Sequence, residues 1–389
     1  MHLAIDASNI RMGGGVTHLS QLLNAANPVD SGIGHVTVWA CAQTADQLPT
    51  LAWLTKLSPD WTESSLFIRL LAQHLFLGDE IESHGCSVLF SPGGTVPFRI
   101  QVPVVTMSQN MLPFEPEEAL HFGRWNFMRL KMWLLRKAQT YSFKKAAGLI
   151  FLTKYARNLV VRQLAAAKGS QVLIPHGIES RFASSPKEQK TAEEYSFRSP
   201  FTFLYVSILM PYKHQIEVAK AACELRLAGY PVRVKFVGAG WGWYGHQFRK
   251  ILKQLDPEGE FLSWSGSIPF SSLHAQYHEA DAFLFASSCE NLPNILIEAM
   301  AAGLPIACSN RGPMPEVLGT AGVYFDPVRP HEIASAMRKL IDTLDLRVSM
   351  AKQAYELSLA YSWRRCAKET FEFIAAVAAQ RDTLKETQR

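Results

Sequence analysis

The sequence lacks any run of eighteen apolar residues, so we expect no helix that spans a bilayer. Its first ten residues, MHLAIDASNI, lack the basic start of a signal peptide, and we expect them to form the first strand of the fold. No Cys-x-x-Cys pair occurs among the six cysteines, which favours buried free thiols in a reducing compartment. Cys289 lies beside Glu290 but has no neighbouring histidine that would make it a nucleophile.

A chain of 389 residues is too long for one ordinary core and long enough for two domains. Its composition, 48% hydrophobic and 19% charged, is typical of a soluble globular protein. Polar residues without apolar periodicity fill positions 181–200, and we place the domain boundary there, between domains at 1–180 and 200–362. Apolar runs alternate with helical stretches in both halves, as in parallel α/β sheets, with strands expected near 2–7, 36–40, 88–90, 102–107, 149–153, 172–178, 201–208, 233–237 and 261–264.

The most informative stretch runs from Asp281 to Pro327. It opens with an apolar strand at 282–286 and a polar turn at 287–291, and helix-forming residues follow from Asn294. Gly303 ends that helix and a second strand follows. A helix that begins at the carboxyl end of a parallel strand offers backbone N–H groups and a partial positive charge, which together favour phosphate binding.

Two carboxylates mark this unit, Glu290 in the turn and Glu298 inside the helix. Placed on either side of the helix start, they can flank a bound diphosphate and accept hydrogen bonds from sugar hydroxyls. The alternative is a solvated Glu290 and a Glu298 that is only a helix-surface charge.

The spacing Glu290-x7-Glu298, followed by AMAAGLPIACS, 312–317 and 321–327, resembles the signature of the family-4 retaining glycosyltransferases. The resemblance covers more than 40 consecutive residues. It implies the GT-B fold, in which two Rossmann-like domains face each other across a cleft and the second binds a nucleoside-diphosphate sugar. It also implies that the C-terminal helix, at about 363–385, crosses back onto the first domain.

The resemblance assigns roles to single residues. Glu298 would bind the donor ribose, and Glu290 would hold the sugar together with the turn Asn291, Leu292, Pro293 and Asn294. Lys213 would stabilise the leaving diphosphate, although Ile208 stands where relatives have an arginine. The alternative for Lys213 is an exposed lysine at a helix start.

Two further segments belong to this expected site. Gly14 and Gly15 lie between a strand and a helix and would face the diphosphate, although glycine-rich turns are often only tight connections. Backbone groups of Gly266, Ser267 and Ile268 would hold the nucleotide base. Gln109 stands where many relatives have a histidine that meets the sugar; an amide can bond a hydroxyl but cannot act as an acid or base.

The segment 121–146 contains seven Lys/Arg and no acid, together with tryptophan, phenylalanine and tyrosine. This composition favours a helix on an anionic membrane surface. Basic and apolar positions spread around the helical wheel, however, and a partly buried helix with snorkelling Lys and Arg explains this equally well. Nucleic acid is a poorer interpretation, because no binding motif accompanies the charge.

We therefore predict a cytoplasmic retaining glycosyltransferase at the inner face of the plasma membrane. It would move a sugar to an acceptor hydroxyl, with a lipid-linked glycan of surface polysaccharide as the acceptor. No Asp-x-Asp occurs, so we expect no cofactor and no bound divalent metal in the transfer. The alternatives are a nucleotide-sugar epimerase on the same fold and a non-catalytic nucleotide-sugar-binding protein, the latter suggested by Gln109 and Ile208.

Overall fold

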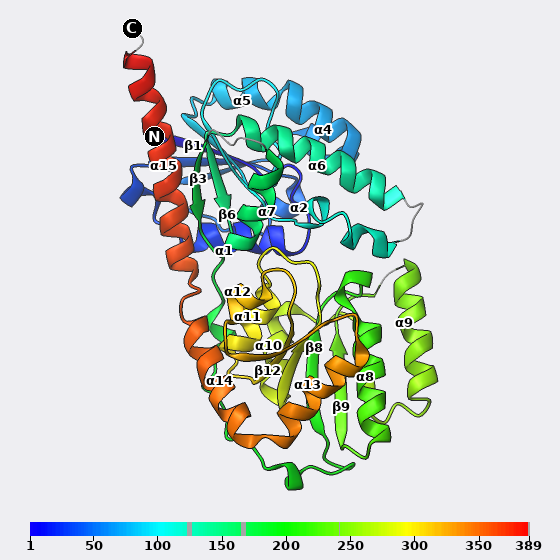
Figure 1. Ribbon diagram of the computed structural model, residues 1–389. Coiled ribbons are helices and arrows are strands. Elements are labelled where there is room, and N and C mark those ends of the chain that lie inside the picture. The colour runs from blue at the N-terminus through cyan, green and yellow to red at the C-terminus, as the bar shows by residue number, and fades with distance from the viewer. Residues whose placement is uncertain (123–126, 165–168, 241, 388–389) are drawn as a thin grey trace. The chain divides into compact units, whose positions relative to one another are not determined.

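The computed structural model describes residues 1–122, 127–164, 169–240 and 242–387 (Figure 1). The chain forms two compact units. Unit 1 contains Met1–Phe114, Phe127–Gly177 and Ser362–Arg389, and unit 2 contains Glu115–Asn126 and Ile178–Tyr361. Both are α/β units built on one parallel sheet, as the alternating pattern predicted.

Unit 1 is built on a seven-stranded sheet with the order β3-β2-β1-β4-β5-β6-β7. Every described pairing in it is parallel, and its central strand β4 is buried along its whole length. Its strands are β1 (His2–Asp6), β2 (His35–Trp39), β3 (Leu54–Leu57), β4 (Val88–Ser91), β5 (Val104–Met107), β6 (Gly148–Phe151) and β7 (Ser170–Leu173). Its helices are α1 (Gly14–Ala25), η1 (Pro28–Ser31), α2 (Ala42–Ala45), α3 (Asp60–Glu63), α4 (Leu66–Leu75), α5 (Leu77–Ser83), η2 (Leu112–Phe114), α6 (Phe127–Lys145), α7 (Lys154–Leu164) and α15 (Trp363–Thr387).

Unit 2 is built on a six-stranded parallel sheet with the order β10-β9-β8-β11-β12-β13. Its strands are β8 (Phe201–Val206), β9 (Val232–Val237), β10 (Leu262–Trp264), β11 (Ala282–Phe285), β12 (Ile306–Ser309) and β13 (Gly322–Phe325). Its helices are η3 (Glu118–Phe122), η4 (Ser180–Phe182), η5 (Ala192–Glu194), η6 (Pro211–Lys213), α8 (Gln215–Leu227), α9 (Gly242–Leu255), η7 (Phe270–Ser272), α10 (Leu273–Glu279), α11 (Asn294–Ala301), α12 (Met314–Leu318), α13 (Pro330–Asp342) and α14 (Leu344–Ser358).

The domain boundary differs from the predicted one. The polar residues 181–200 belong to unit 2, and the chain leaves unit 1 after Gly177. A Cβ on Gly177 would lie 2.0 Å from the backbone nitrogen of Trp363, so only glycine allows the outgoing and returning segments to pass this closely. The linker was misplaced because a polar surface segment and a flexible connection have the same composition.

Helix α15 packs within unit 1 although it ends the sequence. Its Phe373 and Val377 lie against the position of Gly148 in β6, where an added Cβ would meet both side chains at 2.9 Å. Buried apolar positions recur along the helix at Phe371, Ile374 and Ala378, which gives it one face that covers the sheet.

The basic segment predicted as one helix is divided between the units. Residues up to Phe122 belong to unit 2, where η3 ends, whereas α6 begins at Phe127 in unit 1. Positions 123–126, including Trp125, lie outside the described residues. Hydropathy and charge are continuous across this segment, so nothing in the sequence marks the crossing.

All six cysteines are free, as the sequence predicted. Cys289 is buried, and this burial raises the pKa of its thiol, which disfavours the reactive thiolate.

Candidate functional site

Lys213 and Glu290, the residues predicted to contact the diphosphate and the sugar, meet at the carboxyl edge of the unit 2 sheet. Strands β8 and β11 are neighbours, and the loops that follow them carry Lys213 and Glu290. The backbone N–H of Ser288 donates to the carbonyl of Tyr212 at 2.9 Å and ties the two loops together. The Lys213 ammonium donates to Glu290 Oε1. This ion pair lies where ligands bind in open parallel sheets.

Lys213 is a buried cation and not the exposed helix-start lysine of the alternative interpretation. Its Nζ lies over the rings of Tyr212 and Phe285, at 5.3 and 5.6 Å from their centroids. Burial disfavours the charged ammonium, but the Glu290 carboxylate, with smaller contributions from Tyr212 and Cys289, favours it, and the Lys213 pKa is raised. The structure therefore keeps a permanent positive charge inside the site.

Glu298 is buried inside α11 and does not lie on the helix surface as the alternative required. The Tyr277 hydroxyl donates to its Oε2 at 2.7 Å. Burial raises the pKa of the Glu298 carboxyl to about 7, although the Tyr277 hydrogen bond favours the ionised form. A carboxyl held this way is oriented by one protein donor and keeps further acceptor positions for a ligand.

The turn between the two glutamates is compact. Asn291 and Leu292 are buried, Pro293 directly precedes the first residue of α11, and Asn294 begins the helix. Gly312, with φ +58, lies beside this turn: a Cβ there would be 3.6 Å from the Ser288 carbonyl and 3.9 Å from the Glu290 nitrogen. The structure brings the whole predicted turn together with Lys213 at one sheet edge.

The predicted base-binding segment lies at the same edge but beyond β9. Gly266, Ser267 and Ile268 follow β10, and the carbonyl of Gly266 accepts a hydrogen bond of 2.8 Å from the N–H of Gly238, which follows β9. Gly266 has φ +69, and Ser267 is exposed. Ile208, which stands in place of the usual arginine, is also exposed and brings no charge.

The predicted unit 1 residues form a separate group at the start of α1. The left-handed residue of the turn is Gly13, with φ 68, whereas Gly14 and Gly15 are the first residues of the helix and not the turn itself. A Cβ on Gly15 would lie 3.6 Å from Gln109 Oε1. The Gln109 amide Nε2 lies 3.3 Å from Nδ1 of His18, one helical turn further along α1.

Residues 186–357 match the family Glycosyl transferases group 1, and the Glu290–Glu298 spacing lies inside the match. Residues 186–357 therefore belong to the group 1 glycosyltransferase family. The O-antigen chain mannosyltransferase B of Escherichia coli is 26% identical over 168 residues, which are 43% of this chain and 44% of the relative. The match therefore spans less than half of that relative's length.

Solved structures of low identity share the fold over the whole chain. Sucrose-phosphate synthase from Thermosynechococcus elongatus superposes with a TM-score of 0.71 at 18% identity, covering 100% of this chain and 99% of that one. HepE from Anabaena, solved with UDP and glucose, superposes with a TM-score of 0.64 at 16% identity and covers 100% of both chains. The chain has the GT-B fold, with two Rossmann-like α/β domains.

Three residues that the sequence patterns do not single out lie against the predicted site residues or join their loops. Tyr277 holds Glu298, His18 contacts Gln109, and Ser288 joins the Lys213 and Glu290 loops. The position of His18, one turn after three glycines, is a signal that could have been used. Tyr277 precedes Glu298 by 21 positions on another helix, and no sequence spacing indicates their contact.

Proposed function

We propose that the protein transfers a sugar, with retention at the anomeric carbon, from a nucleoside-diphosphate sugar to an acceptor hydroxyl of a lipid-linked glycan. The acceptor class is supported by the similarity to an O-antigen chain mannosyltransferase, and the donor class by the fold shared with a structure solved with UDP and glucose. Assigning the acceptor class and the donor class of those proteins to this chain is part of the proposal.

The observation that carries the proposal is the buried Lys213–Glu290 ion pair beside the start of α11. When the glycosidic bond to a diphosphate breaks, negative charge develops on the departing phosphate oxygen, and a preorganised cation lowers that cost. Lys213 can donate three hydrogen bonds, of which the structure uses one for Glu290. The remaining donors are available for diphosphate oxygens, while Glu290 fixes the ammonium in place.

Glu298 completes the donor side of the proposal. Ribose hydroxyls are good donors to a carboxylate, and the Tyr277 hydroxyl fixes the rotamer of Glu298 before a ligand arrives. Gln109 would contact a sugar hydroxyl through its amide, and Gly266, Ser267 and Ile268 would contact the base. These roles stay predictions from the family resemblance, and so does the expectation that transfer needs no divalent metal.

A thermal-shift panel of UDP, GDP, ADP and TDP tests the donor site. A nucleotide at about 100 times its Kd should stabilise the wild type by about 2.7 kcal/mol through mass action. Glu298→Ala should lose that response, whereas Glu316→Ala, which changes an exposed glutamate of unit 2, should keep it. If none of the four nucleotides raises the melting temperature of the wild type, the donor site is refuted.

We further propose that unit 1 docks on an anionic lipid surface through α4 and α6. One face of α4 exposes a row of apolar side chains, with Phe67 76% exposed, and α6 exposes Trp133 at 52%. Among the described residues, no helix combines the length and apolarity that a bilayer crossing requires. Apolar side chains that lie on the surface together with basic ones are typical of an interfacial site.

Helices α4 and α6 lie near each other in unit 1 (Figure 1) and are joined through the ring of Phe98. The ring of Phe98 stacks on His74 of α4 at 3.8 Å and meets Tyr141 of α6 edge-on at 5.5 Å. Helix α6 supplies six Lys/Arg and no acid, and Lys137 and Lys145 lie over the rings of Trp133 and Tyr141. Each cation near an anionic surface contributes about 1 kcal/mol, so this charge favours phosphatidylglycerol-type lipids over neutral ones.

Flotation with liposomes tests the docking surface. The wild type should float with vesicles that contain anionic phosphatidylglycerol. With vesicles of phosphatidylcholine alone, it should stay in the bottom fraction of the gradient. The double substitution Phe67→Glu/Ile68→Glu should abolish flotation, because it adds two negative charges to the exposed face of α4. Leu227→Glu, at an exposed apolar position of unit 2, is the matched control and should float normally. Equal flotation of all three proteins would exclude the α4–α6 surface.

A further inference from the structure

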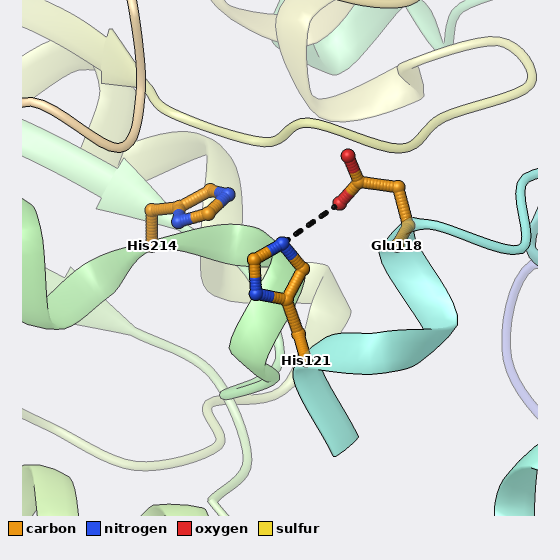
Figure 2. A group of neighbouring side chains, drawn as sticks. All are labelled: Glu118, His121 and His214. Atoms are coloured by element: carbon orange, nitrogen blue, oxygen red, sulfur yellow. Dashed lines mark ion pairs between the residues drawn. The ribbon is translucent and has the colours of Figure 1, made fainter. Parts of the chain in front are cut away.

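A cluster of metal-ligand side chains lies in unit 2 beside Lys213, and none of its three residues has a role assigned toward the donor. Glu118 and His121 come from η3, three positions apart, and His214 follows η6 directly. One oxygen or nitrogen of each residue lies within 4.8 Å of the corresponding atoms of the other two. Figure 2 shows the three side chains converging, with the ion pair between His121 and Glu118 marked.

We propose that Glu118, His121 and His214 bind a divalent transition-metal ion, with zinc as the metal that fits this donor set best. Two imidazoles and one carboxylate are a common set of protein ligands in zinc sites that keep one position open. Softer sites use thiolates, and magnesium and calcium prefer oxygen ligands alone. Nothing in the family match or the comparisons assigns a metal to these residues.

The distances are near those of a bound ion. Ligand atoms at about 2.0–2.1 Å from a tetrahedral zinc lie about 3.3 Å from one another. His121 Nε2 and Glu118 Oε2 are already 3.5 Å apart. The His214 ring lies edge-on to that of His121, with centroids at 5.5 Å, so small side-chain rotations bring the third ligand in.

A second layer of contacts holds the ligands in place. The Ser288 hydroxyl contacts Glu118 Oε2 at 2.5 Å and His214 Nε2 at 2.9 Å, and Glu217 Oε2 lies 3.8 Å from His214 Nδ1. Ligating side chains in metal sites are oriented by such hydroxyl and carboxylate partners. Glu118 and His214 are therefore held close together before any ion arrives. Ligation through His214 Nε2 would replace its contact with the Ser288 hydroxyl, while Nδ1 would still face Glu217.

The backbone at His214 is itself unusual. With φ 52, it is the one non-glycine residue among the described residues in the left-handed region. This conformation costs about 1 kcal/mol or more for a residue with a Cβ, and it persists when the side chain has a use. It directs an imidazole that is 3% exposed toward Glu118, whereas a glycine at this position would remove the strain and the ligand together.

The cluster also has an entrance and a physical consequence. The His121 side chain is 39% exposed, so an ion can reach the site from solvent. A bound ion would cross-link η3, which the chain reaches directly after leaving unit 1 at Phe114, to the segment that carries Lys213. The predicted effect is local: zinc should order residues 115–122 on unit 2.

Zinc titration of tag-free, chelator-treated full-length protein tests the site, with isothermal calorimetry as the readout. The wild type should bind one zinc ion per chain, and His121→Ala should bind it at least about 100-fold more weakly, because an exposed ligand is lost without disturbing the core. Glu118→Gln should weaken binding while keeping an acceptor for Ser288. His331→Ala is the matched control, since His331 also pairs with a carboxylate of unit 2, Glu224, at 2.7 Å.

Hydrogen exchange distinguishes a site from adventitious binding to surface histidines. Zinc should slow amide exchange in residues 115–122 of the wild type and of His331→Ala, and should have no effect there in His121→Ala. Cobalt(II) should give the visible absorption of a tetrahedral complex in the same two proteins only. Equal zinc affinity of the wild type and His121→Ala, or the absence of stoichiometric binding by the wild type, would overturn the proposal.

Discussion

Replacing Lys213 with alanine should lower kcat/KM for sugar transfer by about 10²–10³-fold, the usual effect of removing one preorganised group that stabilises charge in the transition state. The loss should be aggravated by Glu290, whose carboxylate would remain beside the diphosphate without its partner. The measurement is the rate of nucleoside-diphosphate release from the nucleotide sugar selected by the thermal-shift panel.

Two variants separate this role from a loss of folding. Lys213→Arg keeps the positive charge and should retain more activity than Lys213→Ala, although its planar group fits the Lys213 position less well. Lys220→Ala removes an exposed lysine from α8 and should leave kcat/KM unchanged. A well-folded Lys213→Ala protein with less than about a tenfold loss would show that Lys213 does not hold the diphosphate.

The free energy of unfolding of the wild type should fall as the pH rises, because Glu298 ionises. Glu298→Gln should not show this fall. The Glu298 carboxyl has an ordinary pKa of 4.5 when unfolded and about 7 in the buried site. Below the unfolded pKa it is protonated in both states, and its full contribution to stability is present. As the pH rises through the folded pKa that contribution is lost, because the folded state must then bury a charge.

The expected size of this effect follows from the two pKa values. Their separation corresponds to about 3 kcal/mol of unfolding free energy, lost mainly between about pH 4.5 and pH 7. Urea unfolding followed by circular dichroism should therefore show a wild-type curve that falls relative to that of Glu298→Gln across this range. Glu316→Gln, at an exposed position, should follow the wild type. Parallel curves for wild type and Glu298→Gln would mean that Glu298 has a normal pKa.

The sequence indicated most of the secondary structure, because strands and helix ends depend on local patterns, whereas the roles of the site residues stay predictions. The strand at β11, the helix start at Asn294 and the stop at Gly303 follow from apolar runs and terminal residues. Gly303 has φ +64, and a Cβ there would lie 2.7–2.8 Å from the backbone of Pro186 and Ser184. Only glycine therefore suits both the helix end and the space around it. The edge strand β3 was missed, because its half-buried residues show no clean alternation.

What could not be predicted depends on contacts between distant segments. Lys213 and Glu290 are 77 positions apart, and their pairing follows only once β8 and β11 are known to be neighbours. The placement of Glu115–Asn126 in unit 2 is equally invisible, because the chain enters and leaves within a segment of uniform composition. The zinc proposal depends on that placement, which is why sequence analysis gave no indication of it.

The stereochemistry of donor hydrolysis tests the central claim most directly, because it needs no knowledge of the acceptor. With no acceptor present, water can take the sugar, and proton NMR can then follow the first sugar released from the nucleotide sugar that the thermal-shift panel selects, before it equilibrates. For retaining sugar transfer, the first free sugar should have the donor's anomeric configuration, and nucleoside diphosphate should be released in equal amount. Release of the opposite anomer, or conversion of the donor to an epimeric nucleotide sugar without release of diphosphate, would contradict it.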